Sequence, residues 1–313
     1  ISPLEGNLFE KSRFLRRFIE ENLAPDEILH FTMYFPLLLR ARNPIVFTDP
    51  VSNSDYYNFR EKIAVYTRML LADRVDMLDP SRGRRLQKKI FWKPEKVSIT
   101  SNTFVDLEKY KALEWSEKKD WLVFLGRFEP IKQVVEYVRS IPAINKTMRE
   151  LGIKKCNFFL LGHGTLESEL RNILEQPEFN EIDVQIRYEP QPNEILARAK
   201  IFFSLQKFTN FPSKSLAEAL ASGCLPIVTD NGATRKMAKP AFSFYVLENF
   251  SAETLAAKVR EIYELSEEER QKKSNLAREF AASELSIEKM TDYYLDLYAQ
   301  LFLTKNQVKN FTE

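Results

Sequence analysis

Short apolar runs alternate with amphipathic stretches along most of the 313 residues, and this rhythm constrains the fold more than any other feature. In the first half the runs are EILHF, PIVFT, RVDML and KVSIT; in the second they are WLVFLG, NFFLLG, DVQIR, IFFSL and LPIVT. Short runs of β-branched and aromatic residues between helix-period stretches are typical of parallel strands covered by helices. The pattern therefore predicts an α/β fold.

The rhythm breaks at residues 105–120, VDLEKYKALEWSEKKD, where charged residues replace the apolar pattern. We expect a boundary near residue 112, because a chain of this length commonly forms two domains. The expected parts are an N-terminal domain over 1–112, a second domain over 113–285 and a closing helix over 286–313. The second domain has enough strands for a complete doubly wound sheet, whereas the first is short.

Composition excludes several classes of protein. The 46 Lys and Arg against 44 Asp and Glu leave a net charge of +2, too small for a protein that coats nucleic acid. Cys156 and Cys224 stand in apolar runs without a CxxC motif, which favours a reduced, cytoplasmic protein over a disulfide or zinc site. The chain has no apolar run of membrane-spanning length, and its start, ISPLEGNLFEKS, is not a signal peptide.

Polar and glycine-rich residues follow the expected strands of the second half, at the ends where open α/β sheets bind ligands. After WLVFL come Gly126, Arg127 and, five residues after the arginine, Lys132. A planar guanidinium and a point charge together suit a diphosphate. After NFFLL come Gly162 and His163, where missing side chains let backbone amides approach a ligand. Taken one at a time, these residues also fit an ordinary protein surface.

The stretch FTNFPSKSLAEALASGCLPIVTD, residues 208–230, predicts a polar loop, a helix and a strand. A serine is expected to cap the helix, leaving amides and the positive dipole end for an anion. The residues expected to hold that anion are Ser213, Lys214, Ser215 and Leu216. Glu218 lies among small and apolar residues, so we expect a partly buried carboxylate that accepts hydrogen bonds, for instance from a sugar diol. An ordinary helix glutamate is the alternative.

The loop RYEPQP, residues 187–192, offers Tyr188 and Glu189 as a lip for a nucleobase, although its prolines fit an ordinary loop equally well. Cations and amides for phosphate, a carboxylate for ribose and this lip would together form a nucleoside diphosphate site.

Five segments of the chain resemble the retaining glycosyltransferases of the GT-B fold, specifically family 4, also called group 1. The segments follow the same order as in the family; four lie within residues 115–302 and one lies just before residue 115. Gly126-Arg127-Phe128-x-x-x-Lys132 is similar to the family's GRxxxxK loop, whose Arg and Lys hold the donor diphosphate. EALASGCLPIVTD is similar to the segment whose glutamate binds the ribose hydroxyls, a role that passes to Glu218. The other three segments are LLGHGTLESEL, LSIEKMTDYYLDLYAQL and ITSNTFVDLEKYKAL, the last similar to PNGVDLERF.

The resemblance implies two Rossmann-like domains that face a cleft. It also implies transfer of a sugar, with retention, from a nucleotide-diphosphate sugar to a carbohydrate or lipid-linked acceptor. In such enzymes the leaving diphosphate guides the acceptor hydroxyl, and Arg127 and Lys132 stabilise its charge. No metal and no further cofactor is expected, and nucleic acid is not a partner.

The chain departs from the family in several places. The first of two motif glutamates is missing, and Thr209 and Asn210 stand there; Asn210 can hydrogen-bond the donor sugar or a phosphate without carrying charge. Where the family often has a histidine after the second strand, this chain has Asp49. His30 resembles the family's strand-end histidine on the acceptor side, with a structural role as the alternative. The first strand and glycine-rich loop of the N-terminal domain are also missing, so that domain reads as incomplete.

Two alternatives remain open. A basic stretch with two aromatic residues could face anionic lipid or a phosphorylated acceptor, or be an ordinary solvated helix face. Its residues are Arg82, Arg84, Arg85, Lys88, Lys89, Phe91, Trp92, Lys93 and Lys96. The departures also allow a GT-B protein without turnover that binds another transferase as a partner or scaffold. A pyridoxal-phosphate-dependent phosphorylase on this fold is a weaker third reading.

Overall fold

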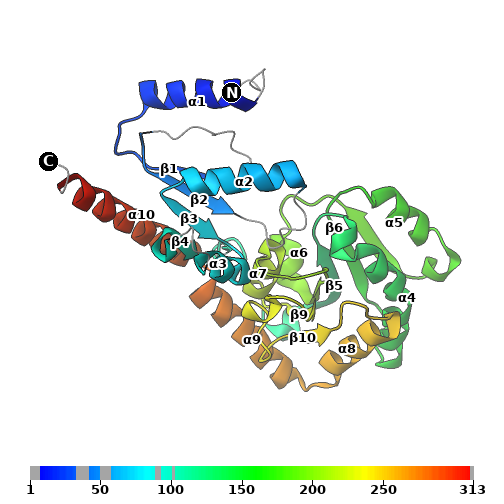
Figure 1. The fold of residues 1–313 in the computed structure, drawn as a ribbon. Coiled ribbons are helices and arrows are strands. Elements are labelled where there is room, and N and C mark those ends of the chain that lie inside the picture. Colours follow the sequence, from blue (N-terminus) through cyan, green and yellow to red (C-terminus); the bar gives the residue numbers. More distant parts are fainter. Residues whose placement is uncertain (1–7, 33–41, 50–57, 89–92, 101–102, 311–313) are drawn as a thin grey trace. The chain divides into compact units, whose positions relative to one another are not determined.

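The computed structural model describes residues 8–32, 42–49, 58–88, 93–100 and 103–310. The chain divides into two compact units: the first contains residues 1–101 and 291–313, the second residues 102–290 (Figure 1). The division lies before the expected boundary at 112. Val105 explains the difference, because its N–H donates to Leu285 O and it bridges to Ser286, both in the second unit.

The first unit contains a four-stranded parallel sheet in the order β1-β2-β3-β4. Its strands are β1 (Leu29–Thr32), β2 (Ile45–Asp49), β3 (Arg74–Met77) and β4 (Val97–Ile99). The four apolar runs of the first half thus form the four strands as predicted. β2 is buried along its whole length, which explains why its sequence is apolar rather than alternating.

The second unit contains a six-stranded parallel sheet in the order β10-β9-β8-β5-β6-β7. Its strands are β5 (Lys119–Leu125), β6 (Asn157–Leu161), β7 (Asp183–Arg187), β8 (Ala199–Ser204), β9 (Leu225–Thr229) and β10 (Phe244–Val246). Numbered along the chain, this is the doubly wound order whose direction reverses between β5 and β8. Ligands of such sheets bind at that switch point, outside the carboxyl ends of the strands.

Helices connect the strands and cover the sheets. They are α1 (Leu8–Asn22), α2 (Phe59–Leu71), α3 (Pro80–Gln87), α4 (Val134–Glu150), α5 (Glu167–Leu174), α6 (Asn193–Arg198), α7 (Lys214–Ala221), α8 (Ala252–Glu264), α9 (Glu267–Glu284) and α10 (Ile287–Asn310). Two clusters of buried side chains in the second unit include residues of α4 and α8 in one and of α7 and α9 in the other. In the first unit Leu297 and Leu301 of α10 pack with Val46 of β2.

None of the helices in the described ranges has the length and apolar character that a membrane span requires. Cys156 and Cys224 are both buried and free. Burial raises the pKa of each thiol to about 11.

Candidate functional site

The loops that follow β5 and β8 meet at the switch point of the second sheet. Lys132 Nζ donates to Gln206 Oε1 at 2.5 Å, and the backbone N–H of Lys207 donates to Ile131 O at 2.9 Å. Gln206 is buried, and its backbone N–H donates to Thr229 Oγ1 at 3.1 Å at the end of β9. Three strand ends therefore fix the position of the Lys132 ammonium.

The two cations of this loop differ in environment. Burial, and secondly the charge of Arg127, lowers the pKa of Lys132 to about 8. Arg127 itself is exposed, and no ion pair or hydrogen bond of its guanidinium is found within the described ranges. A lysine with one amide partner beside an exposed arginine gains stability from an anion that reaches both.

The glycines after β6 have a packing role that the sequence did not predict. A Cβ on Gly162 would lie 1.9 Å from Gly126 O, and one on Gly164 would lie 2.5 Å from Phe128 O. Phe128 N–H donates to His163 O at 2.9 Å. The close backbone approach is thus to the neighbouring loop after β5, and this accounts for the glycines without a ligand.

Two aromatic side chains at the ends of β6 and β7 lie together. The rings of His163 and Tyr188 are 5.1 Å apart at 75°, and the Tyr188 side chain is 63% exposed. Glu189 is held by an ion pair with Arg187 at 3.4 Å and by the backbone N–H of Gln191. The structure thus brings the expected lip next to the histidine turn and leaves its tyrosine ring accessible.

Helix α7 begins as expected, with Ser213 at its N-cap accepting a hydrogen bond from the backbone N–H of Leu216 at 3.4 Å. Glu218 is only 8% exposed. Burial raises the pKa of its carboxylate, against a hydrogen bond from Tyr110 and the charges of Lys214 and Lys109, which lower it. Glu218 lies in α7, whereas Arg127 and Lys132 lie in the loop after β5, so the carboxylate and the two cations come from different elements.

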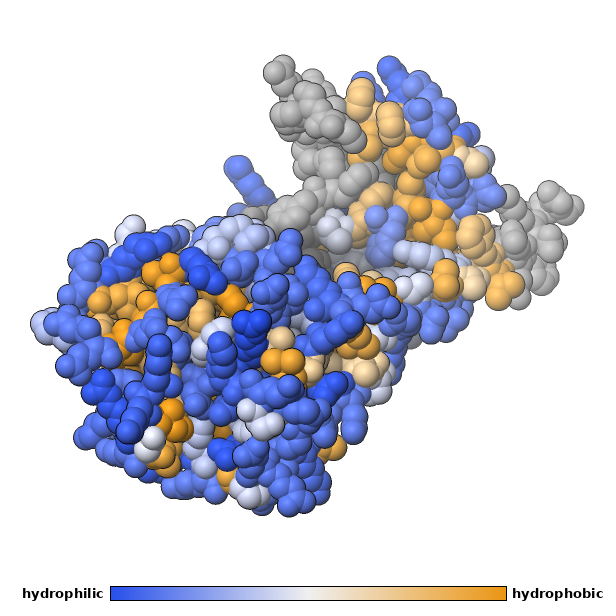
Figure 2. All heavy atoms as spheres, turned by 180° about the vertical axis from the view of Figure 1, so that it is seen from behind, coloured by the Kyte–Doolittle hydropathy of each residue, from blue (hydrophilic) through white to orange (hydrophobic). Residues whose placement is uncertain are grey.

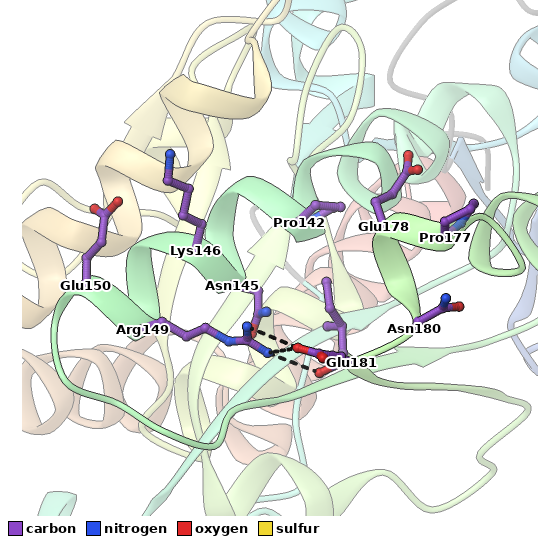
Figure 3. A pocket seen from close by; sticks show the side chains of 10 residues that line it. Pro142, Asn145, Lys146, Arg149, Glu150, Pro177, Glu178, Asn180 and Glu181 are labelled. Carbon is purple, nitrogen blue, oxygen red and sulfur yellow. Dashed lines mark hydrogen bonds and ion pairs between the residues drawn. The ribbon is translucent and has the colours of Figure 1, made fainter.

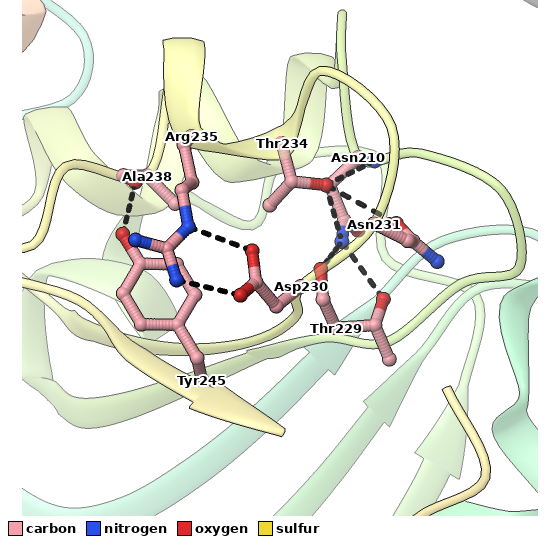
Figure 4. Close-up of polar contacts among 8 residues, drawn as sticks. All are labelled: Asn210, Thr229, Asp230, Asn231, Thr234, Arg235, Ala238 and Tyr245. Carbon is pink, nitrogen blue, oxygen red and sulfur yellow. Dashed lines mark hydrogen bonds and ion pairs between the residues drawn. The ribbon is translucent and has the colours of Figure 1, made fainter. Parts of the chain in front are cut away.

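Asn210 has a different environment from the one expected. It is 0% exposed and accepts a hydrogen bond from Ser204 Oγ at 2.8 Å. It donates to Thr229 O and Thr229 Oγ1 at 3.1 and 3.0 Å (Figure 4). Its backbone N–H donates to Thr234 Oγ1 at 2.9 Å. The amide joins the ends of β8 and β9, and in this structure it has no surface on which a sugar or phosphate could bind.

The two acceptor-side candidates are also engaged internally. His30 bonds through one ring nitrogen to Tyr298 OH and through the other to Thr48 Oγ1, both at 2.7 Å, so the structure favours its structural alternative. Asp49 is fully buried and lies 2.7 Å from Arg82.

Arg82 belongs to the basic stretch that could face lipid, but its side chain is buried and pairs with Asp49. Arg82 is therefore not available to a lipid surface in this structure. Lys89, Phe91 and Trp92 of that stretch lie outside the described residues.

A separate groove of about 730 Å³ lies at the other end of the second sheet (Figure 3). It is lined by the C-terminal half of α4 and by residues 177–182 before β7. Arg149 and Glu181 in it pair with each other at 3.3 Å. Within the part of the chain that the structure describes, no cluster of His, Cys, Asp and Glu could hold a metal ion.

Sequence reasoning missed several residues that build the site. Gln206 and Glu248 are separated from Lys132 by long stretches of chain, and Glu248 Oε2 accepts from Asn231 Nδ2 at 3.1 Å. The signal for Gln206 was available, since it follows β8 at the expected switch point. Tyr110 was hidden because its segment was assigned to the linker between domains.

Two parallel-sheet domains, with cations, a capped helix and a buried carboxylate after strands of the second sheet, define a doubly wound α/β protein with a candidate site for an anion. Residues 106–280 match the family glycosyl transferases group 1. The chain belongs to this family.

Similar proteins agree with this assignment. The N-acetylgalactosamine-N,N'-diacetylbacillosaminyl-diphospho-undecaprenol 4-alpha-N-acetylgalactosaminyltransferase of Campylobacter jejuni is 24% identical over 180 residues, 56% of this chain and 47% of that protein. The chain thus spans about half the length of this relative.

Two solved structures share the fold. TarM superposes with a TM-score of 0.73 at 13% identity, covering 94% of this chain and 59% of TarM. The pneumococcal O-GlcNAc transferase GtfA, solved with UDP and GlcNAc, gives a TM-score of 0.71 at 14% identity, covering 93% of this chain and 60% of that one. The predicted GT-B architecture of two parallel-sheet domains is confirmed.

Proposed function

We propose that the chain transfers a sugar from a nucleotide-diphosphate sugar to an acceptor hydroxyl, with retention of configuration. The observation that carries the proposal is the Lys132–Gln206 pair, a partly buried lysine fixed at the switch point of the sheet beside an exposed arginine. Family membership supports the transferase activity. Retention, and a reaction without metal or cofactor, are taken from the resemblance to retaining enzymes and remain part of the proposal.

The residues have separate tasks in this proposal. Arg127, Lys132 and the first amides of α7 stabilise the charge that grows on the leaving diphosphate. Glu218 in its ionised form accepts hydrogen bonds from the two ribose hydroxyls. Tyr188 covers one face of the base. The chain needs no nucleophile of its own if the diphosphate guides the acceptor hydroxyl.

Calorimetric titration with UDP, GDP and ADP tests the donor site. We expect one nucleotide to bind, and Arg127→Ala and Glu218→Ala to weaken it at least tenfold. Arg139→Ala is the matched control, because Arg139 is an exposed arginine of the same unit in α4. Absence of binding by the wild type would remove the basis for the proposed transferase.

For the acceptor we propose a lipid-linked sugar at an anionic membrane surface. The Campylobacter relative is named for an undecaprenol-linked acceptor. Helix α2 of the first unit presents an exposed apolar stripe of Phe59, Ile63, Tyr66 and Leu70. Lys96 Nζ donates to Leu70 O at 3.0 Å, which sets a cation at one end of the stripe. Figure 2 shows apolar residues reaching the surface between hydrophilic ones on the face that it draws.

Vesicle binding tests this surface. We expect the chain to co-sediment with vesicles that contain phosphatidylglycerol and not with phosphatidylcholine vesicles. The double variant Ile63→Glu, Leu70→Glu should lose the association. Leu303→Glu, at another exposed leucine of the first unit, should keep it. Self-association of the wild type that the double variant abolishes, without vesicle binding, would assign the stripe to a second copy instead.

A second candidate function is a binding partner without turnover. Asn210 favours it, because a buried amide stands where the family has a glutamate. The two functions separate in one assay: nucleotide binding without hydrolysis or transfer of any offered sugar supports the binding partner, and release of nucleoside diphosphate from a sugar donor supports the transferase.

A further inference from the structure

Glu248 follows β10 and is hydrogen-bonded to the loops after the three neighbouring strands of the second sheet. Its Oε2 accepts from the backbone N–H of Phe208, after β8, at 3.2 Å, and from Asn231 Nδ2, after β9, at 3.1 Å. Its backbone carbonyl accepts from Gln133 Nε2, after β5, at 2.7 Å. A single residue thus joins the loops that follow four adjacent strands.

The hydrogen bonds continue from Glu248 to the ammonium group of Lys132. Asn231 Nδ2, which donates to Glu248, also donates to Gln206 O at 2.8 Å. Gln206 Oε1 in turn accepts from Lys132 Nζ at 2.5 Å. Because Gln133 directly follows Lys132 in the chain, the network returns to the loop in which the lysine lies.

Gln133 has an unfavourable backbone conformation within this network. Its φ is +48° and its ψ is 34°, in the left-handed region that residues other than glycine rarely adopt. The residue is 3% exposed, and its side-chain amide makes the hydrogen bond to Glu248 O. A glycine would adopt this conformation without strain but would lose that hydrogen bond. The fold therefore keeps a strained residue whose side chain connects the lysine loop to Glu248.

The carboxylate acts in this network by holding backbone and side-chain donors in place. We propose that Glu248 is a positioning residue, which holds the loop after β8 so that Gln206 fixes the Lys132 ammonium where a diphosphate can bind. The inference rests on the proposed function, because a nucleotide diphosphate is the ligand that the lysine would bind. Charge alone gives the opposite expectation, since a carboxylate close to a diphosphate repels it.

Calorimetric titration with UDP, GDP or ADP, whichever binds the wild type, distinguishes positioning from charge. Glu248→Ala should weaken binding about fivefold, because the loop that carries Gln206 loses its acceptor. Glu248→Gln should stay within about twofold of the wild type, because an amide oxygen can accept both hydrogen bonds. Tighter binding by both variants would show an effect of charge alone and overturn the inference. Glu264→Ala, at an exposed glutamate of α8, is the control.

The amine of Lys132 can also be followed without any nucleotide. Burial, and secondly the charge of Arg127, lowers its pKa to about 8. In Glu248→Ala the released side chain should reach water, which raises this pKa by about one pH unit toward the ordinary lysine value. Loss of a negative charge alone would lower the pKa instead. The rate of acetylation of Lys132 by acetic anhydride against pH, measured by mass spectrometry of its peptide, gives the value.

Thermal unfolding separates positioning from a general structural role. A lower Tm of Glu248→Ala, with nucleotide affinity and lysine pKa both unchanged in the folded variant, would overturn the inference. If Glu248→Ala does not fold, Asn231→Ala replaces it, because this variant keeps the carboxylate and removes the bridge to Gln206 O. The same directions of change are expected for Asn231→Ala.

The inference and the proposed function fail in different ways. A wild type that binds none of the three nucleotides overturns the proposed function, while a raised pKa of Lys132 in Glu248→Ala would still support the positioning of its ammonium. Nucleotide binding by the wild type, with the same affinity and the same lysine pKa in Glu248→Ala, overturns the inference alone.

Discussion

The carboxyl ends of the two parallel sheets are used differently. In the first sheet the polar side chains at the strand ends bond to one another and to α10: Asp76 accepts from Tyr293 OH at 2.7 Å and from Tyr294 OH and Thr48 Oγ1, both at 3.2 Å. In the second sheet the polar and aromatic side chains at the strand ends include exposed Arg127, Tyr188 and Phe208. Similar topology thus gives a structural network in one sheet and a candidate binding site in the other, depending on whether the polar groups find partners within the fold.

Removing the central acceptor of the first network should have the largest effect. Asp76 is fully buried, and Asp76→Ala leaves three hydroxyl donors without their acceptor. We expect the free energy of unfolding to fall by about 3 kcal/mol in urea titrations. Asp292→Ala, at an exposed aspartate of α10, should change it little. A loss for Asp76→Ala as small as that of the control would show that the network is not structural.

Two lysines of the second unit sharpen the contrast. Lys118 Nζ donates to Ala197 O, Ala199 O and Ser222 O at 2.8, 3.1 and 2.8 Å, whereas Lys132 Nζ donates to a side chain, at Gln206 Oε1. Lys118→Met should cost about 2 kcal/mol of stability by leaving the carbonyls without a donor.

Lys132→Met should lower the free energy of unfolding only slightly, because the fold no longer has to desolvate the lysine ammonium. The same substitution should reduce turnover by about 10²-fold, because the leaving diphosphate loses a cation. Steady-state kinetics and denaturant titration of both variants check the pair. Equal stability losses with equal turnover losses would place both lysines in the same structural role.

The pH dependence of nucleotide binding should show Lys132 directly. Its pKa of about 8 means that the free protein loses this charge as pH rises through that value. If the ammonium binds the diphosphate, the affinity for UDP should be flat below this pKa and fall about tenfold one pH unit above it. Titrations at several pH values on either side of the pKa measure the change. The decrease should vanish in Lys132→Met and persist in Arg139→Ala.

The strands could be read from the sequence more fully than the site. Every apolar run that was taken as a strand is one, because the buried parallel strands are continuously apolar. β10 was missed because it is a three-residue edge strand after a long irregular loop. Arg127, Lys132, Ser213 and Glu218 could be proposed from the sequence because residue type and position, after a strand or near the start of a helix, are local signals, and their roles in binding stay predictions.

The partners of the site residues could not be read in the same way. Gln206, Thr229 and Glu248 act through contacts between distant loops, and no local pattern shows such contacts. The same limit applied to Asn210 and His30: each type can bind a ligand, and only the fold shows that Ser204 and Tyr298 already occupy their polar atoms. Whether a polar group is a site residue depends on its partners more than on its type.

The smallest expected effect comes from a single hydroxyl in the first network. Tyr298→Phe removes the partner of His30 Nδ1, which lies 2.7 Å from Tyr298 OH, and should cost about 1 kcal/mol of unfolding free energy. Tyr188→Phe is the matched variant in the second sheet, and since its ring is 63% exposed it should cost close to nothing. Burial lowers the pKa of His30, so the neutral ring is favoured in the fold and the wild type should lose stability as pH falls below 6.5, the usual histidine value. Urea titrations of the wild type and of both tyrosine variants, at pH values above and below 6.5, measure the free-energy cost of each lost hydroxyl and the effect of protonating His30. Equal changes in the two tyrosine variants would mean that the carboxyl ends of the two sheets do not differ as the hydrogen bonds indicate.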